Sequence, residues 1–240
     1  MTEVVHVRSA RRWERFVCAG VVSLASLTLA ADCNGETVFA SAFDSNDLGS
    51  PPAHAQSTGT IALDGPSGSV TVVSAPGSAT GRWAKITRAS SQTSVTAMQC
   101  NLSEFGGDGT FGLLAVLYIP TGAQVATLQF ESFGQAASNY GSFLHLDFLQ
   151  NNTVRFNDED SSAFGSFPRD QAFTVSITLT ITASSASAHV DLLGGASGSA
   201  DHAGTPVAIA QQFGAVRFWM GYPWTGSFYV NDVIVTRQTQ

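Results

Sequence analysis

Residues 173–182 read Phe-Thr-Val-Ser-Ile-Thr-Leu-Thr-Ile-Thr, a strict alternation of apolar and hydroxyl side chains. Successive side chains of a β-strand point to opposite faces, so this period of two predicts a strand with one buried and one hydrated face. An amphipathic α-helix would need an apolar residue every three or four positions instead. The stretch therefore predicts an antiparallel sheet that is covered on one side.

The same period of two recurs along the chain from residue 36 onward. Clusters of Gly, Asn, Pro and Ser, which are typical of turns, separate the predicted strands. Besides 173–182, these strands cover residues 58–63, 69–74, 83–88, 93–99, 112–119, 125–132, 144–148, 154–157, 188–192, 215–220 and 227–236. A short helix is predicted only over 206–213. Many short strands without crossover helices predict an all-β fold, an antiparallel sandwich or barrel, as one domain over 32–240.

The composition excludes several classes of protein. Charged residues make up 12% of the 240 residues, and the formal net charge is −7. A nucleic-acid binder needs a basic face, a disordered chain needs more charge and less hydrophobicity, and a coiled coil needs more Glu, Lys and Leu. We therefore expect a globular β protein that has no nucleic-acid partner.

The N-terminal segment has the pattern of a bacterial-type secretory signal peptide. Four arginines precede an uncharged apolar run over 16–31, which is shorter than the roughly 20 apolar residues that a membrane span requires. We predict that residues 1–31 are removed and that the protein is secreted or lies at the cell surface, with no transmembrane span after cleavage. Lipid attachment at Cys33 is an alternative. The remaining chain has seven basic and sixteen acidic residues, a net charge of −9.

Two cysteines, Cys33 and Cys100, remain after removal of this leader. In an oxidising compartment they allow one intramolecular disulfide, which would stabilise the fold by about 3–4 kcal/mol through loop closure. The alternative is two separate buried thiols. We predict the disulfide between Cys33 and Cys100.

Both ends of this predicted domain carry short recognisable segments. Residues 38–44, Val-Phe-Ala-Ser-Ala-Phe-Asp, and residues 226–235, Gly-Ser-Phe-Tyr-Val-Asn-Asp-Val-Ile-Val, resemble the first and last strands of secreted bacterial concanavalin A-like (laminin-G-like) jelly rolls. The resemblance implies two facing antiparallel sheets, with the first and last strands side by side. Because this architecture hosts lectins, glycan hydrolases, lyases and adhesion modules, it implies a fold without one activity.

Three consecutive predicted strands carry polar residues on their hydrated faces. If these strands are neighbours in space, the residues form one patch on the concave sheet, where ligands of such sandwiches usually lie. The alternative is ordinary solvated positions of a half-exposed sheet. The patch consists of Gln129, Glu131, His145, Asp147, Arg155 and Asn157.

An aromatic cluster follows near the C-terminus. Trp219, Tyr222 and Trp224 lie in Phe-Trp-Met-Gly-Tyr-Pro-Trp, residues 218–224, where Gly and Pro favour a loop that displays the rings. Aromatic faces bind the C–H surfaces of sugars, although core packing of the tryptophans is an alternative. We predict a lectin-like protein that binds a glycan or a surface polysaccharide through the patch and these rings.

A polysaccharide-active enzyme, lyase or hydrolase, is the alternative function, and a structural envelope protein is a third. Glu131 and Asp147 are a candidate carboxylate pair for hydrolysis, and His145 with Arg155 has the residue types of a lyase. However, the chain has no Glu-x-Asp-x-x-Glu strand of the laminarinase-like branch and no Gly-x-Ser-x-Gly elbow. We therefore assign no catalytic residue.

Calcium is the cofactor that the resemblance implies, and it requires six to eight oxygen ligands. The acidic turn at 157–160 lacks the spacing of an EF-hand loop. Asp44 would lie near Asp232 if the terminal strands are adjacent. A calcium site stays open, and no metal-binding residue is assigned.

Overall fold

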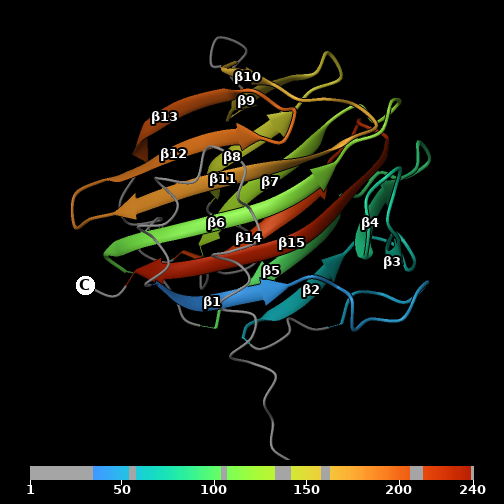
Figure 1. Cartoon of the computed structure of the whole chain (residues 1–240), viewed down its shortest axis with the longest axis horizontal. Helices are drawn as coiled ribbons and strands as arrows, with labels where there is room; N and C mark the ends of the chain where they lie inside the picture. The colour runs from blue at the N-terminus through green and yellow to red at the C-terminus, as the bar shows by residue number, and fades with distance from the viewer. Residues whose placement is uncertain are drawn as a thin grey trace, which may run out of the picture.

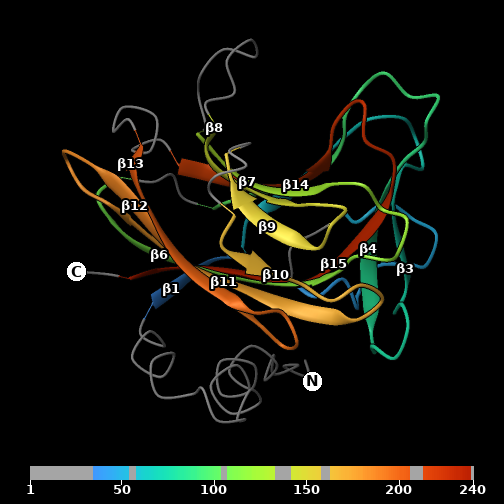
Figure 2. The same cartoon turned by 90° about the horizontal axis from the view of Figure 1, so that it is seen from above.

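The computed structural model describes residues 35–53, 58–103, 107–132, 142–157, 163–205 and 213–238. Every regular element in these ranges is a β-strand, and the strands form two facing antiparallel sheets (Figure 1, Figure 2). The predicted leader, Cys33 and residues 206–212 of the predicted helix lie outside the described residues. Phe213, the last residue of that predicted helix, belongs to a strand instead.

One sheet has eight strands in the order β13-β12-β11-β6-β15-β4-β3, with β1 also paired to β15. The strand predicted over 173–182 is β11, at its interior. The bounds are β1 (Gly35–Ser41), β3 (Val70–Ser74), β4 (Arg82–Arg88), β6 (Gly109–Tyr118), β11 (Ala172–Ile181), β12 (Ala186–Leu193), β13 (Gly198–Thr205) and β15 (Gly226–Gln238).

The other sheet has seven strands in the order β10-β9-β8-β7-β14-β5-β2. It contains the predicted polar patch, because β7, β8 and β9 are neighbours in this order. The bounds are β2 (Thr60–Asp64), β5 (Thr96–Asn101), β7 (Ala126–Ser132), β8 (Ser142–Phe148), β9 (Thr153–Phe156), β10 (Gly165–Ser166) and β14 (Phe213–Met220).

The first and last strands lie side by side, as the resemblance implied. β1 pairs antiparallel with the second half of β15, with Ser41 opposite Val233, whereas the first half of β15 pairs with β4. The pairing of β15 with β6 shifts register between Asn231 and Ile234, where Asp232 has a φ of 47°. The chain therefore folds as an antiparallel β-sandwich of the jelly-roll type, with β15 shared between two partners along one edge.

The core lies between the two sheets and follows from the alternation in sequence. Phe173, Val175 and Ile177 of β11 are at most 1% exposed, and they belong to the same buried cluster as Leu128 and Phe218 of the opposite sheet. Each such apolar side chain contributes about 1.5–3 kcal/mol on burial. Because alternate residues fill this core, the residues between them on β7, β8, β9 and β14 face away from it.

The strand β13 was not predicted. Its sequence, Gly-Ser-Ala-Asp-His-Ala-Gly-Thr, consists of small and polar residues without apolar alternation. The strand forms because its backbone pairs with that of β12 at the edge of the sheet. At an edge, a strand can form with few apolar side chains to bury. Pairing with β12 thus determines that residues 198–205 form a strand, which their local sequence pattern did not indicate.

Candidate functional site

Four side chains form a row across the outer face of the seven-stranded sheet. Arg155 of β9 is the register partner of Asp147 on β8, Asp147 is the partner of Thr127 on β7, and Thr127 is the partner of Trp219 on β14. Directly opposed residues on neighbouring strands have side chains about 4.5–5.5 Å apart at Cβ. The fold therefore brings residues from four separate strands into one continuous line.

This row is part of the wall of a pocket of about 190 Å³. The loop between β14 and β15 and Val125, which precedes β7, supply the rest of the wall. The lining residues are Val125, Thr127, Asp147, Arg155, Trp219, Gly221, Tyr222 and Trp224. Five of the nine predicted ligand-binding residues thus line one pocket, with Tyr222 and Trp224 exposed by 68% and 42%.

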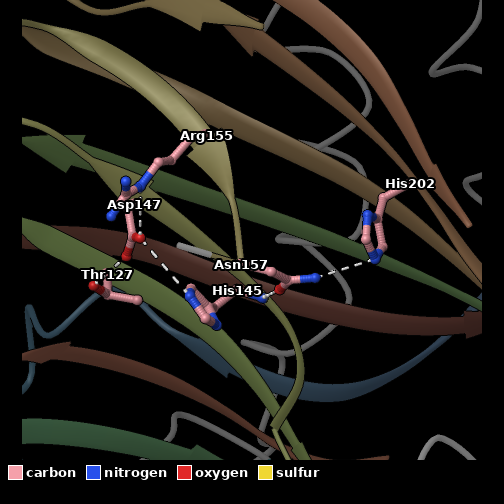
Figure 3. A network of polar contacts seen from close by, with 6 residues as sticks. All are labelled: Thr127, His145, Asp147, Arg155, Asn157 and His202. Carbon is pink, nitrogen blue, oxygen red and sulfur yellow. Dashed lines mark hydrogen bonds and ion pairs between the residues drawn. The ribbon is translucent and has the colours of Figure 1, made fainter. Parts of the chain in front are cut away.

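Asp147 organises the polar side of the pocket (Figure 3). Its buried carboxylate accepts a hydrogen bond from Thr127 Oγ1 at 2.8 Å and another from Arg155 Nε at 3.2 Å, while His145 Nε2 lies 3.8 Å away. A buried carboxylate is tolerated when cations and hydroxyls compensate its charge. Asp147 therefore holds Thr127 and Arg155 in fixed orientations at the pocket.

Gln129 and Glu131 belong to a second network on the same face. Oε1 of the buried Glu131 accepts hydrogen bonds from Gln129 Nε2 at 3.0 Å and from Arg217 Nη1 at 3.1 Å. Arg217 Nη2 also donates to Asp64 Oδ2 at 2.8 Å. The buried Glu131 Oε2 and Trp219 Nε1 have no hydrogen-bond partner within the described ranges. This network holds the side chain of Arg217 in place. Arg217 precedes Trp219, a residue of the pocket wall, by two positions on β14.

The carboxylates of Glu131 and Asp147 do not form the close pair that a glycoside hydrolase needs. Asp147 is opposite Thr127, and Glu131 lies four residues further along β7. At the rise of a strand, this offset is about 13 Å, whereas hydrolytic carboxylates are roughly 5–9 Å apart. The sheet register thus provides no support for hydrolysis by this pair.

Asn157 directly follows β9, has a φ of 47° and does not line the pocket. Its Oδ1 accepts the backbone N–H of His145 at 2.9 Å, and its Nδ2 lies 3.2 Å from Nε2 of His202 on β13 (Figure 3). The amide therefore links the edges of the two sheets.

Thr127, Arg217 and Gly221 were not among the residues predicted for the site. Thr127 is in phase with Gln129 and Glu131 on the predicted strand 125–132, and Arg217 is in phase with Trp219. The alternation of side chains that identified these neighbours was therefore a signal that could have identified Thr127 and Arg217 as well. Gly221 is required for space, because a Cβ there would lie 2.4 Å from the Trp219 ring.

Cys100 is bonded to no other cysteine of the described residues, and its side chain is fully buried in β5. Burial in an apolar environment raises the pKa of its thiol far above the usual range. Because Cys33 lies outside the described residues, the disulfide between them stays a prediction for non-reducing peptide mapping.

The residues near the terminal strands give limited support for calcium. Burial and the charge of Asp44 raise the pKa of Asp232, and the buried Oδ1 of the adjacent Asn231 has no partner in the described ranges. Two carboxylates and one amide fall short of the six to eight oxygens that calcium requires. The described chain contains no group of three or more His, Cys, Asp or Glu residues arranged for a metal ion. Residues 158–160 of the acidic turn lie outside the described residues.

Comparisons with known proteins bear on the fold. No family model and no curated protein matches this chain. A carbohydrate esterase of the Shiga toxin-encoding bacteriophage phi24B superposes with a TM-score of 0.55 at 11% sequence identity, over 85% of this chain and all of the other. The likeness is one of fold.

Two further solved structures are similar at lower scores. Lectin II from Ulex europaeus has a TM-score of 0.46 at 10% identity, over 78% of this chain and 95% of the lectin. Trypanosoma rangeli sialidase has a TM-score of 0.42 at 18% identity, over 75% of this chain and 30% of the sialidase. These weaker likenesses support no assignment.

Proposed function

We propose that this protein binds a glycan and that the pocket beside Trp219 holds one sugar unit. The observation that carries the proposal is the convergence of three aromatic side chains with Thr127, Asp147 and Arg155 around one small pocket. Aromatic faces pack against the C–H surface of a sugar, and fixed polar groups bind its hydroxyls. The two kinds of group meet because residues of the loop after β14 and polar residues of β7, β8 and β9 line the same pocket.

The charge of the site favours a neutral ligand. Asp147 offsets the charge of Arg155 at 3.2 Å, so the pocket wall holds a compensated ion pair. Without the predicted leader, the net charge of −9 also repels polyanions. We therefore propose a neutral glycan or surface polysaccharide as the partner.

The proposed setting is the outside of the cell. The predicted leader and the Ser/Thr-rich wet faces of the strands support export, and lipid attachment at Cys33 would keep the protein at the membrane surface. Within the described ranges, no helix is long and apolar enough to cross a membrane. The phage esterase of similar fold is named for action on carbohydrate, which is in keeping with a glycan ligand but indicates fold alone.

Binding of the purified exported protein to a panel of neutral and uronic-acid glycans tests the proposal. We expect binding to neutral glycans that falls at least tenfold in Trp224→Ala. Leu63→Ala on β2 is the matched control, because Leu63 and Trp224 are equally exposed at 42%. Absence of binding across the panel would overturn the proposal. Unsaturated or hydrolysed products in parallel assays would replace it with the enzyme alternative.

A further inference from the structure

The loop over 221–225 carries the two exposed rings of the pocket, and a buried arginine lies behind it. Arg88 is the last residue of β4 and is the register partner of Gly226, where the loop enters β15. Its side chain is 1% exposed although it carries a full charge. A buried guanidinium is costly unless its N–H groups find acceptors, so its partners define what it does.

The hydrogen bonds of Arg88 that the structure shows all end on backbone carbonyls. Nε donates to the carbonyl of Ser94 at 2.9 Å, Nη1 donates to that of Trp224, and Nη2 donates to that of Gln92. A guanidinium is a rigid planar fork of five donors, so three simultaneous acceptors fix their mutual geometry. Arg88 thereby ties the turn after β4 to the loop after β14.

The same guanidinium also contacts an aromatic ring of the pocket. Its central carbon lies 5.4 Å from the centroid of the Tyr222 ring, within the range of a cation–π interaction. One charged group thus holds the carbonyl of Trp224 and supports the ring of Tyr222. Gln124 holds the far end of the loop, because its Oε1 accepts the N–H of Thr225 at 2.7 Å.

We propose that Arg88 is a positioning residue for the pocket, setting glycan affinity by fixing where the rings of Tyr222 and Trp224 stand. The inference rests on the proposed glycan-binding function. Arg88 belongs to the eight-stranded sheet, and in this role it controls a pocket on the seven-stranded sheet. Arg88 acts through the loop, because it is not among the residues that line the pocket.

Two variants of Arg88 test the inference, with dissociation constants and amide hydrogen exchange as readouts. Arg88→Met removes all donors, whereas Arg88→Lys keeps the charge without the three-way fork. We expect Arg88→Met to raise the Kd for glycan at least tenfold and to speed exchange in 221–226 at least tenfold, with β11 unchanged. Arg88→Lys is expected to lie between wild type and Arg88→Met. Arg82→Lys is the matched control, since Arg82 lies on the same strand and its guanidinium donates to the carbonyl of Asn46 instead.

The two readouts separate failure of this inference from failure of the proposed function. Unchanged loop exchange in folded Arg88→Met, or faster exchange with an unchanged Kd, overturns the positioning role. If the wild type binds no glycan, the proposed function fails and the affinity claim fails with it, while exchange still reports whether Arg88 holds the loop. If Arg88→Met does not fold, Arg88→Lys decides: faster exchange with weaker binding supports the role, and wild-type behaviour overturns it.

Discussion

Arg155 Nε lies 3.2 Å from Oδ2 of Asp147, and the two residues are register partners on neighbouring strands of one sheet face. The side chain of Asp147 is 4% exposed and that of Arg155 is 14% exposed. The pair is therefore largely shielded from water at the edge of a pocket that also has aromatic walls. This relationship makes the polar half of the site rigid before a ligand arrives.

The ion pair predicts strong coupling between its members. We expect Asp147→Asn and Arg155→Gln each to lower the free energy of unfolding by about 1–3 kcal/mol, because each removes one charge of an ion pair that is largely shielded from water. The double variant is expected to cost less than the sum of the two by at least about 0.5 kcal/mol. Urea denaturation of the three variants checks this. Strict additivity would show that the two groups act independently.

Gly221 is expected to control the position of the Trp219 ring. Gly221→Ala would place a Cβ 2.4 Å from Cζ3 of that ring, so the ring must move at a cost of about 1–3 kcal/mol. We expect altered tryptophan fluorescence and weaker glycan binding. Combining it with Trp219→Phe, whose smaller ring leaves room, is expected to recover stability. Wild-type fluorescence and affinity in Gly221→Ala would contradict the tight contact.

A histidine on the outer face of the eight-stranded sheet predicts a pH-dependent stability. Nδ1 of His189 lies 2.8 Å from Asp201 and its Nε2 lies 3.3 Å from Asp191. The hydrogen bond with Asp201, with a smaller contribution from Asp191, raises the pKa of His189. The resulting stabilisation is present below the ordinary histidine pKa and is lost as pH rises through the raised value.

The contribution of His189 is small, because these side chains are 43–85% exposed. We expect the free energy of unfolding of the wild type to exceed that of His189→Gln by less than about 1 kcal/mol. This difference should be larger in mildly acidic than in alkaline buffer. Urea midpoints measured over this pH range check the sign. A difference that grows with pH would contradict the assignment.

Asp232 also has a raised pKa, and here we expect a substitution to stabilise the fold. Burial and the neighbouring charge of Asp44 raise its carboxyl pKa, so the charged form is disfavoured in the fold. The stability that protonation gives is present below the ordinary aspartate pKa and is lost as pH rises through the raised value. Asp232→Asn removes the cost of holding a charged carboxylate there at neutral pH, and Asn tolerates the positive φ of this position. The variant should therefore raise the urea midpoint at neutral pH, measured with a chelator present so that bound calcium plays no part. A lower midpoint would contradict the prediction.

The local alternation in sequence predicted most strands because the period of two is a property of each segment. The stretch 173–182 is β11 over 172–181, and the predicted strand 215–220 is part of β14. β13 was missed because its small and polar residues have no apolar alternation and its pairing with β12 decides its structure. Asp147 and Arg155 were predicted together because a short turn joins β8 and β9.

By itself the sequence determined a β-rich chain and which residues of each strand share a face, since both follow from the alternation of side chains. It did not determine that Gln129, Glu131 and Asp147, on the face that faces away from the core, are buried rather than hydrated. Tertiary structure alone decided that Trp219 stands beside Thr127 and that Arg88 reaches the carbonyl of Trp224, 136 residues away. Such contacts depend on strand order and register, which are set by how the two sheets pack. No local pattern of residues carries that information, so the pocket exists only once the sandwich has formed.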